Sequence, residues 1–281
     1  MNKKTKVWLV VAALLILIGV IVFGGVMSML NWDFTKLSTV KLETNSYDIN
    51  EEYKNISIIT ETSNVEFVPS KDAATLVVCH EHENAQHSVL VTDGTLVIKI
   101  ENNKKWYEFI NVSFDIPKIT LYIPQREYGD ICVKTSTGNI ELENISSESV
   151  DISVSTGRIA LCGVECVEKM SVAVSTGKVS VGNTRCDSFI SKGSTGNISL
   201  ENVIVEDRLD IERSTGSVEL EHCDAGQLSV ITKTGGIKGS LLSEKLFVAE
   251  SNTGSIDVPA TTSGGRCELR TNTGSIKIEL E

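Results

Sequence analysis

The sequence predicts an all-β protein: a parallel β-solenoid (β-helix) with coils of 19–20 residues, preceded by one N-terminal transmembrane α-helix. Three observations carry this prediction. A Thr-Gly phrase returns eight times, apolar residues recur at fixed offsets from each glycine, and a 24-residue stretch near the amino end carries no charge. A period this short, without a helical pattern inside it, is typical of coils that stack to share one core.

The uncharged stretch covers residues 7–30 and would form a helix of about 36 Å, long enough to span a bilayer. Lys3, Lys4 and Lys6 precede it, so the positive-inside rule places the amino end in the cytoplasm and the rest outside the cell. A cleavable signal peptide is the alternative, but it needs a shorter apolar region and a small-residue cleavage site. We therefore expect a signal-anchor, with a cytoplasmic tail at 1–6 and a single-pass anchor at 7–30.

A stalk at 31–55 and one extracytoplasmic domain at 56–281 should follow, with an irregular lead-in at 56–130 and regular repeats at 131–281. Within the lead-in, Asp93-Gly94 between two apolar runs predicts a hairpin or a coil corner. Residues 62–65 read Thr-Ser-Asn-Val, a degraded copy of the repeat phrase. Residues 102–110 form a looser insertion rich in aromatic residues.

Each repeat phrase has a glycine preceded by threonine, and successive glycines are 19, 20, 19, 20, 19, 19 and 20 residues apart. Glycine supplies a positive φ at no steric cost, so it predicts a tight corner. The threonines before it should stack as a ladder at the strand spacing of about 4.8 Å. These structural turn residues are Gly138, Gly157, Gly177, Gly196, Gly216, Gly235, Gly254 and Gly274.

Apolar residues stand seven and five positions before the glycine, and two and four positions after it, with Ser191 and Gly239 as exceptions. The step of two within each arm predicts a strand with one buried face on either side of the corner. Two positions after the glycine, all eight residues are β-branched: Ile140, Ile159, Val179, Ile198, Val218, Ile237, Ile256 and Ile276. Successive coils should therefore pair in parallel and in register.

A second corner is expected six residues after each glycine, where Asn144, Gly163, Asn183, Asn202 and His222 tolerate the left-handed conformation. In the last coils, Leu241 and Ala260 occupy this position, which predicts a remodelled corner. Ser191 and Gly193 replace an apolar pair, so we expect a bulge in the fourth coil.

The carboxyl end of the chain, Glu281, directly follows the last predicted strand at residues 275–280. We expect an open solenoid end there, which is either protected by Lys277, Glu279 and Glu281 or forms end-to-end homo-oligomers.

With its anchor, its Leu-Tyr-Ile-Pro lead-in at 121–124 and its repeated Ser/Thr-Thr-Gly-x-Ile phrases, the chain resembles a bacterial β-strand-repeat envelope family, the putative adhesins or domain of unknown function 4097. The resemblance covers residues 50–281. It implies a cell-envelope role. The family is common in Gram-positive bacteria, and some of its members are linked to envelope stress or antimicrobial-peptide responses. The resemblance carries over no residue-level site, because the motif is structural.

Charge and cysteine content limit the partners. The net charge is −11, or −14 when the three amino-terminal lysines are set aside. An acidic rod should repel nucleic acid and attract cationic peptides, and acidity also keeps a β-rich surface soluble. Seven cysteines leave at least one unpaired, and we expect mainly reduced thiols. A disulfide between Cys166 and Cys186, which should stack on neighbouring coils, is the alternative.

The candidate metal ligands are His80, His82 and His87. His80 and His82 should share a strand face and could ligate zinc or copper, although polar residues are also expected next to a turn. No catalytic motif is found, and the coils lack the insertions that build a cleft. We therefore expect no catalytic residues, no cofactor and no enzymatic activity.

Together these features predict a non-enzymatic single-pass membrane protein that presents a rigid solenoid as an adhesin-like binding or scaffolding surface. Expected partners are a glycan or another envelope protein. The alternative is a sensor or modulator of envelope or antimicrobial-peptide stress that acts through a membrane partner. A polysaccharide-active enzyme is a third reading, because parallel β-helices also host such enzymes.

Overall fold

The computed structural model describes residues 2–37, 42–101 and 115–281, which fall into two compact units. The amino-terminal unit holds α1 (Lys3–Met29) and a short 3-10 helix (Phe34–Leu37). By length and composition, α1 could cross a membrane, as the sequence predicts. The second unit begins at Glu43 and contains the solenoid.

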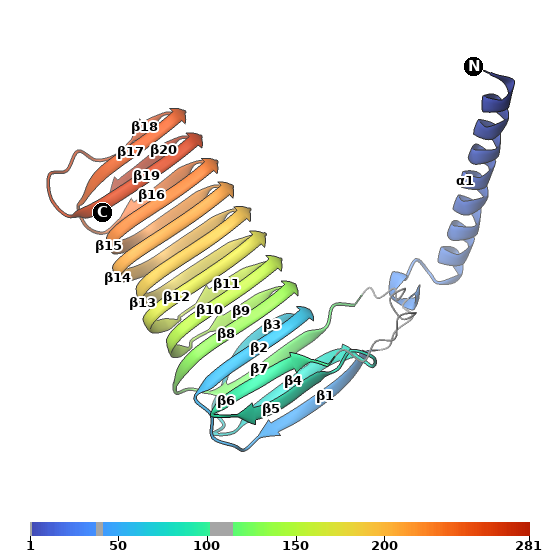
Figure 1. Ribbon diagram of the computed structural model, residues 1–281, viewed down its shortest axis with the longest axis horizontal. Coiled ribbons are helices and arrows are strands. Elements are labelled where there is room, and N and C mark those ends of the chain that lie inside the picture. The colour runs from blue at the N-terminus through green and yellow to red at the C-terminus, as the bar shows by residue number, and fades with distance from the viewer. Residues whose placement is uncertain (1, 38–41, 102–114) are drawn as a thin grey trace. The chain divides into compact units, whose positions relative to one another are not determined.

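Among the described residues, the solenoid unit has twenty strands, drawn in Figure 1. Their bounds in chain order are β1 (Leu42–Ile49), β2 (Asn55–Thr62), β3 (Asn64–Ser70), β4 (Thr75–His82), β5 (His87–Thr92), β6 (Thr95–Ile100), β7 (Lys118–Pro124), β8 (Glu127–Thr137), β9 (Ile140–Glu143), β10 (Ser146–Thr156), β11 (Ile159–Cys162), β12 (Glu165–Thr176), β13 (Val179–Thr195), β14 (Ile198–Thr215), β15 (Val218–Thr234), β16 (Ile237–Leu241), β17 (Lys245–Thr253), β18 (Ile256–Asp257), β19 (Gly265–Thr273) and β20 (Ile276–Leu280).

Successive coils pair in parallel and in register on both sides of the Thr-Gly corner, which confirms the predicted solenoid. The strands before the corner stack as β8–β10–β12 and on through the ends of β13, β14 and β15. Those after it stack as β9–β11 and on through the starts of the same three strands. Within the core, for example, Ile152 faces Val133 on one side and Val172 on the other.

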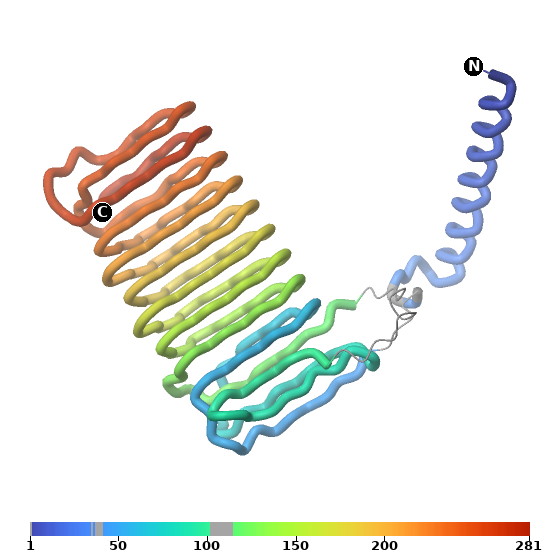
Figure 2. Tube along the Cα trace, in the orientation of Figure 1, coloured from blue at the N-terminus to red at the C-terminus, as the bar shows by residue number. Residues whose placement is uncertain are grey.

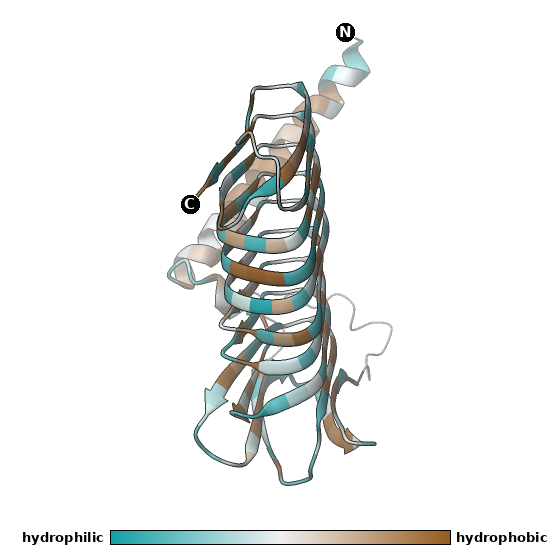
Figure 3. Cartoon of the chain, turned by 90° about the vertical axis from the view of Figure 1, so that its left-hand side faces the viewer, coloured by the Kyte–Doolittle hydropathy of each residue, from teal (hydrophilic) through white to brown (hydrophobic). Residues whose placement is uncertain are grey.

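Alternation along each strand sends one row of side chains into the core and the next to solvent. The predicted apolar row after the glycine is buried in seven coils, for example at Ile140, Ile159, Val179, Ile198 and Val218, which are at most 1% exposed. Ile256 departs from the prediction: it lies in the outer strand β18 and is 45% exposed. Figure 3 shows this alternation as bands of hydrophobic and hydrophilic colour along the strands. A single continuous core therefore runs through the stack.

Two independent constraints require glycine at the Thr-Gly corner. Its φ is positive, for example +151° at Gly177, and a Cβ there would lie 1.6 Å from the carbonyl oxygen of Gly157 in the next coil. The threonines just before the glycines form the predicted ladder, with Thr156 paired to Thr137 and to Thr176. The corner therefore cannot take a residue with a side chain.

The second corner also follows the prediction. Asn144, Asn183, Asn202 and His222 have φ values of 49–54°, and Gly163 has a φ of 65°. At the same offset in a later coil, Leu241 instead lies in β16 and is fully buried. The corner is therefore remodelled there, as expected.

The coil that is last in the sequence is not last in space. β19 lies between β15 and β17, and β20 lies between β16 and β18. In Figure 2 the dark red final coil is accordingly flanked by an earlier coil on each side. The predicted open end at residues 275–280 is therefore wrong, because the open strand edges belong to β17 and β18.

The amino-terminal end of the stack shows the same kind of insertion. β2 lies between β6 and β8, and β3 lies between β7 and β9, so the first coil in sequence is covered by later strands. Its phrase at 62–65 is a true copy of the repeat, since Thr62 pairs with Thr137.

Antiparallel strands close this end: β5 forms the predicted hairpin with β6, and β4 pairs with β7. β1, in the segment expected as a stalk, pairs with β4. The expected aromatic insertion at 102–110 lies outside the described residues.

Candidate functional site

A shallow groove of about 620 Å³ crosses five coils on the sheet face that precedes the Thr-Gly corner. We call it the axial groove. At the spacing of neighbouring strands, five coils extend over about 19 Å. Its lining consists of Ser153, Val154, Ser155, Ala173, Val174, Ser175, Lys192, Gly193, Ser194, Glu212, Arg213, Ser214, Ile231 and Lys233.

Two outward rows shape the axial groove. Two residues before the glycine, four of the five coils that line the groove carry serine: Ser155, Ser175, Ser194 and Ser214. Two positions earlier the row runs Ser153, Ala173, Lys192, Glu212 and Ile231, each paired in register with the next. The serines of the first row leave the hollow open and line it with hydroxyl groups, while the second row adds the charged side chains of Lys192 and Glu212.

Arg213 fills the space left by Ser191 and Gly193 in the neighbouring coil. Its Nη2 donates to Ser191 Oγ at 2.8 Å, and its Nη1 lies 2.7 Å from where a Cβ of Gly193 would stand. The strand keeps its register here, with Ser191 opposite Ile211 and Gly193 opposite Arg213. The strand has no bulge at Ser191 and Gly193, because a guanidinium group occupies the missing volume; the register shift of this coil lies between Cys186 and Ser188 instead.

The Arg213 guanidinium is an unusual buried cation beside the axial groove. Arg213 is 4% exposed, and burial lowers its pKa to about 10. Nη1 donates to Glu212 O, whereas Nε makes no hydrogen bond within the described part of the chain. Arg213, Lys192 and Lys233 give the lining of the groove three cationic groups against one carboxylate, Glu212. Oε2 of Glu212 lies 3.5 Å from Lys192 Nζ.

A second hollow, of about 730 Å³, lies among the turns between residues 125 and 185. Its charges are balanced, and its two arginines are engaged. Arg126 donates to Tyr53 O at 2.7 Å and lies over the Tyr53 and Tyr128 rings. Arg185 pairs with Glu206 at 2.8 Å. The second hollow therefore has fewer cationic groups available to a ligand than the axial groove.

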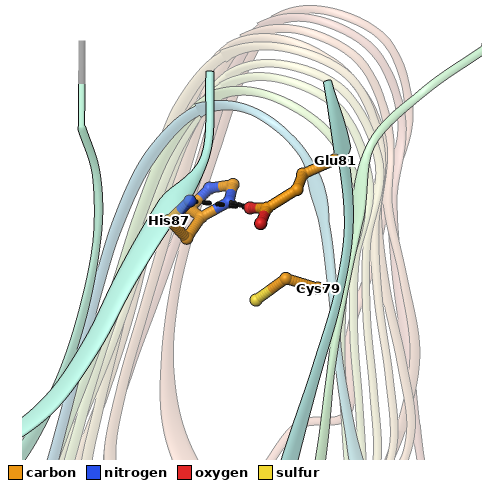
Figure 4. A group of neighbouring side chains, drawn as sticks. All are labelled: Cys79, Glu81 and His87. Atoms are coloured by element: carbon orange, nitrogen blue, oxygen red, sulfur yellow. Dashed lines mark hydrogen bonds and ion pairs between the residues drawn. The ribbon is translucent and has the colours of Figure 1, made fainter. Parts of the chain in front are cut away.

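The three histidines expected as metal ligands do not converge. His80 is exposed on β4 and contacts Thr44 Oγ1 at 2.8 Å, while His82 is half-buried on the same face of that strand. His87 is 4% exposed and begins β5. It lies with Cys79 and Glu81 inside the unit (Figure 4).

Glu81 and His87 form a buried hydrogen-bonded pair. Oε2 of Glu81 lies 2.6 Å from His87 Nδ1 and accepts the His87 backbone N–H at 2.7 Å, while Oε1 accepts Asn45 Nδ2 at 2.8 Å. Burial opposes ionisation of this carboxyl group, but the hydrogen bonds from His87 and Asn45 lower the pKa of Glu81. Glu81 is therefore held as a carboxylate.

The far nitrogen of His87, Nε2, lies 3.0 Å from Thr60 Oγ1. A carboxylate, an imidazole and a hydroxyl in line have the order of a nucleophilic relay. Thr60, however, is 5% exposed and donates its proton to Ser63 Oγ, so the hydroxyl is committed within the protein. The chain of contacts joins β2, β4 and β5 and closes the end of the core.

All seven cysteines lie in the described ranges and are unpaired. Cys166 and Cys186 are partners on neighbouring strands, as predicted, and both are buried. Burial raises the pKa of both thiols, to about 12 for Cys186. Cys162 is exposed and Cys132 is half-buried.

A family model, described as Toastrack DUF4097, matches residues 53–281. The chain belongs to this family.

Solved structures related to this Toastrack chain are distant in sequence. A putative lipid-binding protein from Parabacteroides distasonis is 17% identical, with 84% of this chain and 97% of that chain covered and a TM-score of 0.52. A putative adhesin from the same species is 11% identical (85% and 98% covered, TM-score 0.49). One from Bacteroides fragilis is 16% identical (85% and 97% covered, TM-score 0.41). No curated protein matches the chain.

Two buried residues of this Toastrack chain, Glu81 and Arg213, could have been identified from the sequence. Val77, Cys79 and Glu81 alternate along β4, so Glu81 could have been placed on the inward face with the two apolar residues. Arg213 stands where other coils place an inward Val154 or Val174, which could have marked it as a buried cation. The partners Asn45 and Thr60 had no local signal, because they come from strands distant in sequence.

Proposed function

We propose that the protein is a non-enzymatic, membrane-anchored envelope protein whose solenoid binds extended glycans along the axial groove, in the manner of an adhesin. The observation that carries the proposal is the groove itself, in which serine hydroxyl groups repeat across four of its five coils. A glycan offers hydroxyl groups along its length, so an extended chain can form similar hydrogen bonds in each coil. The regular coil spacing favours a repetitive ligand.

Charge favours an anionic glycan. Lys192, Lys233 and Arg213 surround the axial groove with one carboxylate, Glu212, in a chain whose net charge is −11. Such a local excess of cations attracts carboxylate, phosphate or sulfate groups, while the acidic remainder of the solenoid repels them. An anionic polymer would thus be directed to the groove.

The buried relay supports a non-enzymatic role. Thr60 hydrogen-bonds Ser63 and His87, and all three side chains are at most 5% exposed. A nucleophile must reach a substrate and pass its proton to the base, but here the Thr60 proton is directed away from His87. The network therefore stabilises the end of the core.

The apolar helix α1 supports a membrane anchor, with the solenoid outside the cell. The intact mass of protein extracted from membranes tests this part of the proposal. A mass near 30.5 kDa is expected for the retained anchor. A shortened chain released from the membrane fraction would contradict it.

A polymer-binding screen on the full-length protein in detergent tests the main proposal. Immobilised anionic, neutral and cationic polysaccharides should be compared at low and moderate salt. We expect preferential retention on anionic glycans that weakens as salt rises, because the lysines contribute through screened electrostatics. Equal retention on all three classes, or on none, would contradict the proposal.

A further inference from the structure

Three side chains of different chemistry meet in the buried end of the core. Cys79 and Glu81 point inward from β4, and His87 points toward them from β5 (Figure 4). Their exposed fractions are 0%, 0% and 4%. One sulfur, one carboxylate oxygen and one imidazole nitrogen lie within 4.8 Å of one another.

Hydrogen bonding decides which nitrogen of His87 can be a ligand. Thr60 donates to Ser63 Oγ at 3.1 Å, and Ser63 donates to Thr62 O at 2.8 Å. The Thr60 oxygen can therefore only accept from His87 Nε2, which must carry a proton. The lone pair available for a metal ion belongs to Nδ1, the nitrogen that faces Glu81.

The contact between Nδ1 and Glu81 Oε2, at 2.6 Å, needs a positive species between its two acceptors. In the metal-free protein this is a proton shared between Glu81 and His87. A metal ion can replace it, with a small widening of the contact. The outer contacts needed to orient such ligands are present, since Asn45 holds Glu81 Oε1 and Thr60 holds His87 Nε2.

We propose that Cys79 Sγ, Glu81 Oε2 and His87 Nδ1 bind one divalent ion of the zinc type. Mixed sulfur, nitrogen and oxygen donors suit Zn²⁺ better than the harder ions Mg²⁺ and Ca²⁺. Binding releases two protons, one from the Cys79 thiol and the one shared between Glu81 and His87. The thiolate and carboxylate then balance the two positive charges, so the buried site is neutral.

The ion would act as a staple. It would join β4 to β5 directly, and through the outer contacts of Asn45 and Thr60 it would also fix β1 and β2. These strands close the amino-terminal end of the coil stack. Metal binding should therefore raise the thermal stability of the solenoid, because the folded state alone holds the ligands together.

Cobalt(II) binding to the full-length, chelator-treated protein in detergent tests the proposal. One Co²⁺ per chain should bind, with the near-ultraviolet absorption of a thiolate–cobalt bond, and Zn²⁺ should displace it. Cys79→Ala should abolish the absorption. Asn45→Ala should keep it but weaken binding by about 10- to 100-fold, as is usual for an outer contact.

Two matched controls separate this site from other thiols and histidines. Cys267→Ala removes an equally buried thiol outside the cluster and should keep the absorption. His80→Ala removes an exposed histidine of β4 and should also keep it. Absence of the absorption in the wild-type protein would overturn the proposal, and so would its persistence at full strength in Cys79→Ala.

Discussion

At the scale of single residues, the corner glycines are the positions that tolerate least change. Gly177 has a φ of +151° and lies against the carbonyl of Gly157 in the next coil. An alanine there must both adopt an unfavourable conformation and push two coils apart. The glycine of the Thr-Gly phrase is thus needed both for the turn and for the close approach of neighbouring coils.

We expect Gly177→Ala to lower the free energy of unfolding by at least about 3 kcal/mol, because strain and a backbone clash act together. Guanidinium unfolding of the full-length protein in detergent measures it. Gly182→Ala is the matched control in the next stretch of chain, where a Cβ would meet its nearest neighbour at 3.9 Å. Equal losses in the two variants would contradict the stacking account.

The cysteines provide a second residue-scale prediction. Burial raises the pKa of Cys186 and Cys267 to about 12, so these thiols stay protonated and unreactive at pH 8. With a thiol reagent we expect one fast reaction, at the exposed Cys162, and seven reactions after unfolding without reductant. Fewer than seven after unfolding would reveal a disulfide instead.

At the scale of elements, the open end of the stack is held by a buried ion pair. Lys245, at the start of β17, lies 2.6 Å from Asp224 of β15, with side-chain exposures of 5% and 25%. Burial opposes ionisation, but hydrogen bonds from Lys245 and Ser243 lower the pKa of Asp224. The pair thus connects the outermost coil to the regular stack.

A carboxyl group whose pKa is lowered by folding stabilises the folded state at pH values above its ordinary pKa. This contribution is lost as the pH falls from the ordinary pKa toward the lowered one. Amide exchange in β17 should therefore accelerate below about pH 3.8, the ordinary value for Asp224. Asp224→Asn should accelerate it already at pH 7, with a local loss of roughly 3 kcal/mol, since Lys245 is left unpaired.

Glu279→Gln removes a partner from an exposed pair with Lys277 and is the control for that experiment. It should leave the exchange of β17 unchanged, because solvent screens exposed pairs. Faster exchange in Glu279→Gln than in Asp224→Asn would contradict the assignment of the end coil.

Local pattern was enough to predict the coil length, the parallel register and both corners, because each depends on residues within one repeat. The order of the end coils could not be predicted. The phrases at 252–256 and 272–276 are identical, so either can stack on the coil of Gly235 with similar contacts. The cluster at Glu81 and the contact of Arg213 with Ser191 likewise depend on side chains brought together only by the stacking.

At the scale of the whole solenoid unit, two polar regions differ in exposure. At one end, buried polar groups form hydrogen bonds within the protein, whereas the polar face with the axial groove is open to solvent. The Glu81 cluster is enclosed and acts on the solenoid itself, whereas the axial groove lies open across five coils. This division would allow one repetitive sequence to carry both the proposed metal site and the proposed binding surface.

The most direct test of the account is the affinity of an anionic polysaccharide for wild-type protein and for two tyrosine variants, measured by calorimetry. Ser175→Tyr places a large side chain in the axial groove, and Ser275→Tyr makes the same change at an exposed position outside it. The account predicts at least a tenfold loss of affinity for Ser175→Tyr and wild-type affinity for Ser275→Tyr. Equal affinities in all three proteins would show that the groove is not the binding site.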